Sequence, residues 1–505
     1  MSASELPARL ALFALAAAAA VLPFLAVDFP PVTDLPQHLA QVRLLDETLA
    51  DPGSPYRVQW LTPYGLVYAL FAAALAVAPP LAAGRLAMAV LAVGWVGAVH
   101  LLAARRGRPA AAATLASVLV FHHALYWGFA SFLLGWPLFA GWFLLLARQP
   151  APAGRRGREA VGLGVAALVL YLAHALWLAA AVVWLAVDAV VGRRRWREVA
   201  WRAAGVAPVA ALAAWWFAGL GGTSFATPPL WVAPLGRLDP RWWVEAVFGG
   251  LTSGIETAVF VALLAWLALA VLAGRVRPGG EGGGEAAGAG WDRRLALLGG
   301  GMLLAALLLP DKYTNTIEMN TRWAAPGLAA LLLAVPAPRL PRRAAPALAA
   351  LAALCLAGYA AWTAATWRLF ERVDLAGLPA ALAALPEEPR LVGLDYRRRS
   401  ALLDNPPFLQ TFAWAQVVSG GTLNFSFAEF PPSLVVYRDG PRPWTSGIEW
   451  YPERLRPADL AWFDHALVDA PPELHGRIAL HPAMTPVTTE GLWRLYRIAP
   501  PPAQP

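Results

Sequence analysis

Asp34 and His38 are the two side chains whose types and spacing are best suited to catalysis. They belong to the segment Asp34-Leu35-Pro36-Gln37-His38-Leu39, which follows an apolar run over about residues 10–27. Pro36 suits the first turn of a helix and Asp34 suits its N-cap, so a carboxylate and an imidazole should meet just beyond an apolar segment. A carboxylate in this position can serve as a general base. The alternative is that Asp34 only caps the helix and His38 is an interfacial polar residue.

The composition places this pair in a membrane protein. Of the 505 residues, 58% are hydrophobic and 14% are charged, and the mean hydropathy is +0.52. Soluble domains are less apolar and carry about 25% charged residues, so a soluble, disordered or fibrous chain is excluded. The net charge of +8 forms no basic stripe, which argues against a nucleic-acid partner. The single cysteine, Cys355, excludes an intrachain disulfide and a cysteine-based metal site.

Arginine clusters indicate how the chain crosses the membrane. Clusters near residues 105–108, 155–158, 193–197, 275–294 and 339–343 alternate with pairs of apolar segments, and cytoplasmic loops carry the excess of arginine. The pattern predicts about 11 spans, a cytoplasmic N-terminus and an external C-terminal region. Residues 62–79 are short and end near two prolines, so we expect a re-entrant or interfacial helix there. Two spans with an external arginine patch are the alternative.

The sequence resembles the GT-C superfamily of membrane glycosyltransferases, which use polyprenyl-phosphate-linked sugars. Asp34 matches the acidic position of that family's first external loop, and the segment from Asp34 to Leu39 is similar to its Asp-x-Pro-x-His-Leu version. The resemblance implies that Asp34 and His38 are catalytic. The family's usual adjacent acidic pair is missing, so no metal ligands are assigned. A divalent metal, Mg²⁺ or Mn²⁺, stays open as a cofactor.

A late polar segment, residues 311–323, is similar to the external loop in which GT-C enzymes bring an arginine to the donor phosphate. Arg322 is the matching residue, and a guanidinium binds phosphate oxygens bidentately and stays charged. Lys312 is a candidate second cation. Glu318 is a candidate partner of Arg322 and a candidate substrate contact. The alternative is that Arg322 only anchors the chain at the interface.

His174 and a tryptophan pair complete the candidate residues. His174 interrupts an apolar stretch that resembles the short paired helices of GT-C proteins, which implies a role in binding the donor phosphate; a simple turn residue is the alternative. Trp242 and Trp243 lie in the long segment of residues 221–253. Such aromatics are normally interfacial anchors, and otherwise they could contact the sugar or cover the lipid.

The chain is expected to contain two domains. Residues 1–370 form the predicted GT-C-like transmembrane module, including the first external loop at residues 28–61. Residues 371–505 are less apolar and contain short strand-like runs at 391–394, 433–437, 466–468 and 492–496, which predicts a small periplasmic α/β domain. The expected fold class is therefore an α-helical polytopic membrane protein with a small C-terminal α/β domain.

The function implied by the resemblance is transfer of a sugar from a polyprenyl phosphate to a glycan, lipid or protein acceptor. We expect this reaction at the periplasmic face of a bacterial inner membrane, with Asp34 as the general base. A transporter or flippase for a lipid-linked substrate is the rival, but it would need ionisable residues inside the bundle, and the polar residues gather on one face instead. A catalytically inactive GT-C-like scaffold is the third alternative.

Overall fold

The computed structural model of the protein describes residues 6–148, 152–223, 225–274, 291–336, 344–440 and 442–499. These residues are mostly helical, with small sheets formed by a few short strands. They group into two compact units: unit 1 comprises residues 1–23, 88–125 and 129–364, and unit 2 comprises residues 24–87, 126–128 and 365–505. The predicted domain boundary after residue 370 stays a prediction.

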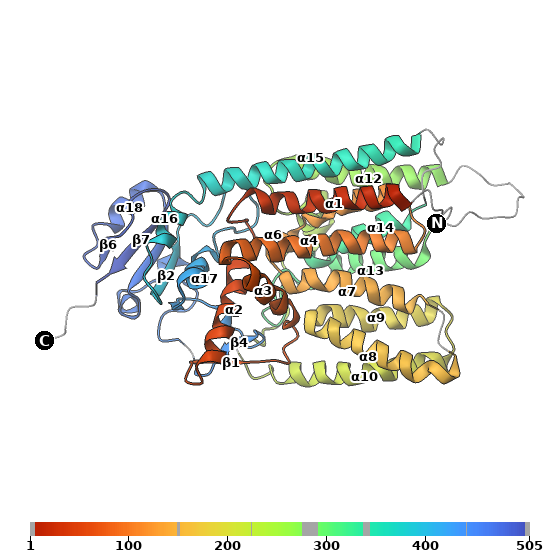
Figure 1. Cartoon of the computed structure of the whole chain (residues 1–505), viewed down its shortest axis with the longest axis horizontal. Helices are drawn as coiled ribbons and strands as arrows, with labels where there is room; N and C mark the ends of the chain where they lie inside the picture. The colour runs from red at the N-terminus through yellow and green to blue at the C-terminus, as the bar shows by residue number, and fades with distance from the viewer. Residues whose placement is uncertain are drawn as a thin grey trace, which may run out of the picture. The chain divides into compact units, whose positions relative to one another are not determined.

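Unit 1 is helical because its segments are rich in alanine and leucine, the strongest helix formers, and because a bilayer requires every backbone group to be bonded within the chain. Figure 1 shows α8, α9 and α10 packed side by side. The helices with residues in unit 1 are α1 (Leu6–Ala26), α4 (Pro80–Arg105), α5 (Ala110–Ala116), α6 (His123–Tyr126), α7 (Ala130–Leu146), α8 (Arg156–Ala173), α9 (Ala175–Val191), α10 (Trp196–Ala218), α11 (Pro240–Val247), α12 (Ile255–Gly274), α13 (Arg293–Leu308), α14 (Ala324–Ala334) and α15 (Ala344–Val373).

Five of the described helices are long and apolar enough to cross a membrane: α1, α4, α10, α12 and α15. Shorter apolar helices accompany them, among them α7 and α9. The predicted count of about 11 spans stays a prediction. Arg275, Arg277, Arg339, Arg342 and Arg343, which support the predicted orientation, lie outside the described residues.

Buried acidic residues pair with arginines at the ends of the helices in unit 1. The Asp188 carboxylate lies 2.5 Å from Arg294 and 3.3 Å from Arg194, and it is almost fully buried. Asp292 lies 2.6 Å from Arg106. Removing either partner of a buried pair leaves an uncompensated buried charge. Loss of one partner should therefore destabilise the packing of these helix ends.

Unit 2 combines short helices with strands. Its helices are α2 (Leu35–Ala50), α3 (Leu66–Val77), α16 (Leu378–Ala383), α17 (Trp414–Ser419) and α18 (Pro472–Ile478), and its strands are β1 (Tyr56–Val58), β2 (Arg390–Asp395), β3 (Thr422–Leu423), β4 (Val435–Tyr437), β5 (His465–Asp469), β6 (Met484–Pro486) and β7 (Trp493–Ile498). Helix α3 has 12 residues, about 18 Å of helix, which is too short to cross a bilayer core of about 30 Å.

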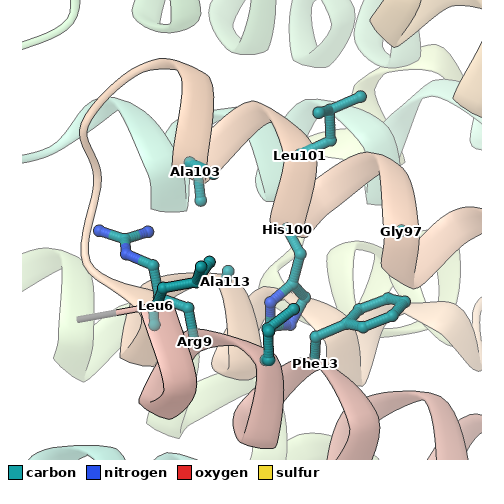
Figure 2. A pocket seen from close by; sticks show the side chains of 11 residues that line it. Leu6, Arg9, Phe13, Gly97, His100, Leu101, Ala103 and Ala113 are labelled. Atoms are coloured by element: carbon teal, nitrogen blue, oxygen red, sulfur yellow. The ribbon is translucent and has the colours of Figure 1, made fainter. Parts of the chain in front are cut away.

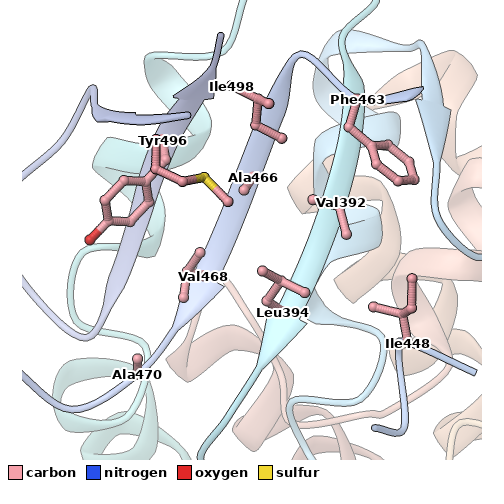
Figure 3. Close-up of a cluster of buried hydrophobic side chains, with 10 residues drawn as sticks. Val392, Leu394, Ile448, Phe463, Ala466, Val468, Ala470, Tyr496 and Ile498 are labelled. Atoms are coloured by element: carbon pink, nitrogen blue, oxygen red, sulfur yellow. The ribbon is translucent and has the colours of Figure 1, made fainter. Parts of the chain in front are cut away.

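The small predicted α/β fold is confirmed near the C-terminus. Five strands form a sheet in the order β3-β2-β5-β7-β6, in which β2 is parallel to β3 and β5 and β7 is antiparallel to its neighbours. Figure 3 shows the apolar cluster on this sheet, with Val392, Leu394 and Val468 among its buried members. The predicted strand at residues 433–437 forms β4, which pairs with β1 outside this sheet.

Candidate active site

Asp34 is the one accessible residue in a buried stretch of unit 2. From Phe29 to Val42 every residue except Asp34 is buried, and Asp34 itself is partly exposed. Asp34 occupies the N-cap position of α2, yet its side chain makes no capping hydrogen bond. The capping alternative therefore does not account for the carboxylate.

Backbone contacts hold Asp34 in place. The Asp34 amide donates to the Trp127 carbonyl at 3.1 Å, and the Thr33 amide donates to the Tyr126 carbonyl at 2.9 Å. Gly128 must be glycine because its φ is +78° and an added Cβ would lie 2.8 Å from the Asp34 nitrogen. Residues 126–128 therefore hold the backbone that carries the Asp34 carboxylate, and we call them the backbone clamp.

His38 contacts this clamp. Its Nε2 lies 3.0 Å from the Gly128 carbonyl, so this nitrogen carries the proton and donates, and its Nδ1 lies 3.3 Å from the Tyr68 hydroxyl. Burial lowers the pKa of His38 to about 4, although the bond with Gly128 acts in the opposite direction. His38 is therefore a neutral ring at pH 7, and its contacts are those of a residue that positions the clamp.

The amide side chains of α2 bind the C-terminal part of unit 2. Gln37 donates to Gln410 at 2.9 Å and accepts from the Phe427 amide at 3.1 Å. Gln41 bonds with both the amide and the carbonyl of Val435, at 2.9 and 3.1 Å. The first loop is thus fixed by residues that follow it by more than 370 positions, which the local sequence does not indicate.

Arg322 is a buried cation in unit 1. It belongs to a short 3₁₀ turn, residues Thr321–Trp323, and only 6% of its surface is exposed. Its guanidinium carbon lies 3.6 Å from the centre of the Phe129 ring, a cation–π contact. Its Nε and Nη2 donate to the backbone carbonyls of Glu318 and Ile317, at 3.2 and 2.9 Å.

The remaining guanidinium nitrogen of Arg322, Nη1, faces His174. The two nitrogens, Arg322 Nη1 and His174 Nε2, are 3.3 Å apart, while His174 Nδ1 accepts from the Leu176 amide at 3.1 Å as the N-cap of α9. A neutral imidazole has one acceptor nitrogen and one donor nitrogen. This contact places an always-charged guanidinium directly beside a buried imidazole, and the tautomer of His174 sets which of the two nitrogens donates.

The loop that carries Arg322 is anchored on both sides. At its start, Arg237 donates to Asp311 at 2.7 Å and to the last carbonyls of α13. Further along, the Glu318 carboxylate lies 3.3 Å from His123 and accepts from Thr321 at 3.1 Å. Burial acts to raise the pKa of Glu318, but the bonds from His123 and Thr321 and the charge of Arg322 outweigh it and lower the pKa.

The remaining predicted residues are Lys312 in this loop and the tryptophan pair on α11. Lys312 is joined to Leu230 through backbone hydrogen bonds in an isolated bridge. Trp242 and Trp243 are partly exposed on α11, their rings 5.0 Å apart, and α11 packs against the turn that carries Arg322. Their predicted roles, like those of Asp34, His38, His174, Glu318 and Arg322, stay predictions.

Sequence reasoning missed Phe129 and the pairing of His123 with Glu318. The sequence signal for this region is the run of His122, His123, Gly128 and Phe129 between two apolar segments.

The described residues around Asp34 form no cluster of metal ligands. Among the described residues, no group of three or more histidine, cysteine, aspartate or glutamate residues is placed to hold a metal ion. Asp28 lies 2.9 Å from Arg85, and Glu47 pairs with Arg43 at 3.2 Å. Asp28 and Glu47 are thus engaged with arginines, while Asp46 is exposed.

Comparison with known proteins identifies the architecture. No protein-family model matches the chain, and no curated protein matches its sequence. Among solved structures, the chain is similar to the crystal structure of ArnT from Cupriavidus metallidurans bound to undecaprenyl phosphate, with 13% identity, a TM-score of 0.53, and coverage of 99% of this chain and 100% of that one. The chain shares the fold of that structure. The predicted fold class is confirmed, and the roles of individual residues depend on the contacts described above.

Proposed function

We propose that this protein transfers a sugar from a polyprenyl phosphate to a hydroxyl of a glycan, lipid or protein at the periplasmic membrane face. Asp34 is the general base, and Arg322 and His174 bind the donor phosphate. ArnT, whose fold the chain shares, was solved with undecaprenyl phosphate bound, which supports a lipid phosphate as the donor's carrier.

The observation that carries the proposal is the placement of Asp34. A carboxylate that is left accessible in an otherwise buried stretch, and whose side chain does not cap its helix, is suited to a proton transfer. The clamp of residues 126–128 fixes its backbone, and His38 fixes the clamp through the Gly128 carbonyl. We therefore assign His38 a positioning role.

Arg322 and His174 are suited to binding the donor phosphate, which is the leaving group. Arg322 is a buried guanidinium beside His174, and its carbon lies 3.6 Å from the centre of the Phe129 ring, so its charge is held in a fixed place. Donors that are already in position stabilise charge that develops in the transition state at little reorganisation cost. Lys312 is retained as a second cation, and Glu318, Trp242 and Trp243 as substrate contacts.

The reaction balances without a cofactor. The acceptor hydroxyl gives its proton to Asp34, and its oxygen forms the new bond to the anomeric carbon of the donor sugar. The bond between that carbon and the phosphate oxygen breaks, and the phosphate keeps the electron pair. Polyprenyl phosphate leaves as an anion beside Arg322 and His174.

The test is release of polyprenyl phosphate by the purified full-length protein. A panel of polyprenyl-phosphate pentoses and hexoses is incubated with a bacterial envelope extract that supplies acceptors. We expect the wild type to release polyprenyl phosphate from one of the donors and Asp34→Asn to lose this activity. Asp28→Asn is the matched control, because Asp28 lies in the same loop, is 62% exposed and pairs with Arg85.

Equal release by wild type and Asp34→Asn would remove the proposed base. Absence of release from every donor would favour the transporter or the inactive scaffold. Those two are separated by measuring movement of a labelled polyprenyl-phosphate sugar across vesicles that contain the protein.

A further inference from the structure

A cavity in unit 1 lies far along the chain from the residues assigned to catalysis. It has a volume of about 250 Å³ and is formed by the first turns of α1, the last turns of α4 and the start of α5. Its wall is apolar apart from Arg9 and His100. In Figure 2, His100 lies between Arg9 and Phe13.

Arg9 stands at the polar end of this cavity. Its Nη2 donates to the Arg108 carbonyl at 2.9 Å, which uses one of the five N–H donors of the guanidinium and holds the group in place. Among the ion pairs of the described residues, Arg106 and Arg108 share Asp292, whereas neither Arg9 nor the exposed Arg105 has an acidic partner. Among the described residues, no acidic side chain therefore balances the charge that Arg9 brings to the cavity.

His100 is a polar group inside the apolar part. Its Nε2 is buried and has no hydrogen-bond partner among the described residues, and Phe13 contacts its ring edge-on at 5.6 Å. A buried polar atom without a partner is unfavourable, and an ionisable residue in a membrane helix suggests a binding function. A ligand with an oxygen at this depth would provide the missing partner.

We propose that this cavity binds an anionic glycerophospholipid from the bilayer. The lipid phosphate lies at Arg9, a glycerol or ester oxygen lies at His100, and the upper part of an acyl chain fills the space beside Phe13 and Gly97. From Arg9 to Phe13 on α1, and from His100 to Gly97 on α4, a polar residue is followed by an apolar part of the wall, as a polar head is followed by an acyl chain in a phospholipid. Basic pockets between membrane helices bind acidic headgroups in this way.

The position of His100 favours a phospholipid over a polyprenyl phosphate, because a polyprenyl phosphate is hydrocarbon beyond its phosphate and offers no ester oxygen. From Leu6 to Phe13 the lining extends for about 10 Å along α1, which accommodates a headgroup and part of an acyl chain. The phospholipid proposal is independent of the proposed sugar transfer, because none of the lining residues has a role in it.

Two variants test the two halves of the site. Arg9→Gln removes the cation at the mouth. Gly97→Leu fills the apolar part, and the fold should tolerate it because an added Cβ at Gly97 meets no atom within 4 Å. Gly141→Leu is the matched control, since Gly141 also lies in an apolar helix with open space at its Cβ. Arg293→Gln is the control for charge.

Native mass spectrometry of the detergent-solubilised full-length protein counts bound lipid. With equal amounts of phosphatidylglycerol and phosphatidylcholine, we expect the wild type to prefer phosphatidylglycerol and Arg9→Gln to lower that preference roughly fivefold. Gly97→Leu should lose the bound lipid of both kinds, and both controls should behave as wild type.

Equal binding of the two lipids by the wild type would overturn the proposal, as would unchanged binding by Gly97→Leu. Displacement of phosphatidylglycerol by an equal amount of polyprenyl phosphate would also contradict it. Melting temperatures of all variants show whether Gly97→Leu is folded, and Arg9→Gln keeps the test decisive if it is not.

Discussion

At the scale of single residues, Arg322 is a buried cation that its neighbours hold in place. Its Nη1 lies 3.3 Å from His174 Nε2, and its Nε and Nη2 donate to the backbone carbonyls of Glu318 and Ile317. The guanidinium is thus fixed in position before any ligand arrives. The Phe129 ring restrains the guanidinium from the other side.

Arg322→Lys should weaken the binding of polyprenyl phosphate by about tenfold or more, because a lysine keeps the charge but loses the planar fork and the stacking on Phe129. Equilibrium binding of polyprenyl phosphate to the purified protein measures this. Arg241→Lys is the matched control, since Arg241 is 93% exposed. Equal affinities of the two variants would argue against a phosphate at Arg322.

Asp469 should make the stability of the C-terminal sheet depend on pH. Burial, together with the neighbouring Asp395, raises the pKa of Asp469 to about 9, although Arg397 opposes the shift. The protonated form is therefore favoured in the folded state. This contribution is fully present below the unfolded pKa of about 4 and is lost as the pH rises towards 9.

The backbone amides of β2 and β5 should accordingly be less protected from hydrogen exchange at pH 8 than at pH 6, after correction for the pH dependence of the intrinsic exchange rates. Asp469→Asn keeps the shape but cannot titrate, so its protection should change little between the two pH values. A wild-type protection that is constant or increases with pH would contradict the assignment.

At the scale of elements, the segment joining α6 to α7 determines where Asp34 lies. Tyr126, Trp127 and Gly128 present their carbonyls to Thr33, Asp34 and His38. These contacts join residues about 90 positions apart, so periodicity along the chain does not reveal them.

Gly128→Ala should reduce sugar transfer more than it reduces donor binding. The alanine Cβ would press on the Asp34 nitrogen, and a positive φ costs a non-glycine residue about 1–2 kcal/mol. Gly107→Ala separates the steric contact from the backbone strain. Gly107 also has a positive φ, of +66°, but no atom lies within 4 Å of an added Cβ. Steady-state kinetics of both variants should show a loss of kcat in the first alone.

The sequence predicts the elements better than it predicts their contacts. Apolar composition is enough to predict the helices. The break between α8 and α9 falls at His174, as the sequence predicts. The strand run at residues 466–468 lies within β5. The contacts of Arg322 with Phe129, and of His123 with Glu318, join residues more than 190 positions apart. Such pairs depend on helix packing, which one sequence does not encode locally.

At the scale of the whole molecule, the fold shared with ArnT spans the chain, but the orientation in the membrane is inferred from the placement of arginines. We expect the C-terminal region outside and the loop near residues 155–158 inside. In a Cys355→Ala background, Leu480→Cys should react with an impermeant maleimide on intact spheroplasts, because Leu480 is 84% exposed. Arg156→Cys should react only after lysis, and the reverse pattern would invert the topology.

The most direct test of the account separates donor binding from chemistry in two variants. Donor affinity and the rate of polyprenyl phosphate release are measured for Asp34→Asn and Arg322→Gln. We expect Asp34→Asn to bind the donor as the wild type does and to release it about 100-fold or more slowly, because a general base typically contributes that much. Arg322→Gln should instead bind the donor more weakly. If Asp34→Asn releases polyprenyl phosphate at the wild-type rate, Asp34 is not the base and the central claim is wrong.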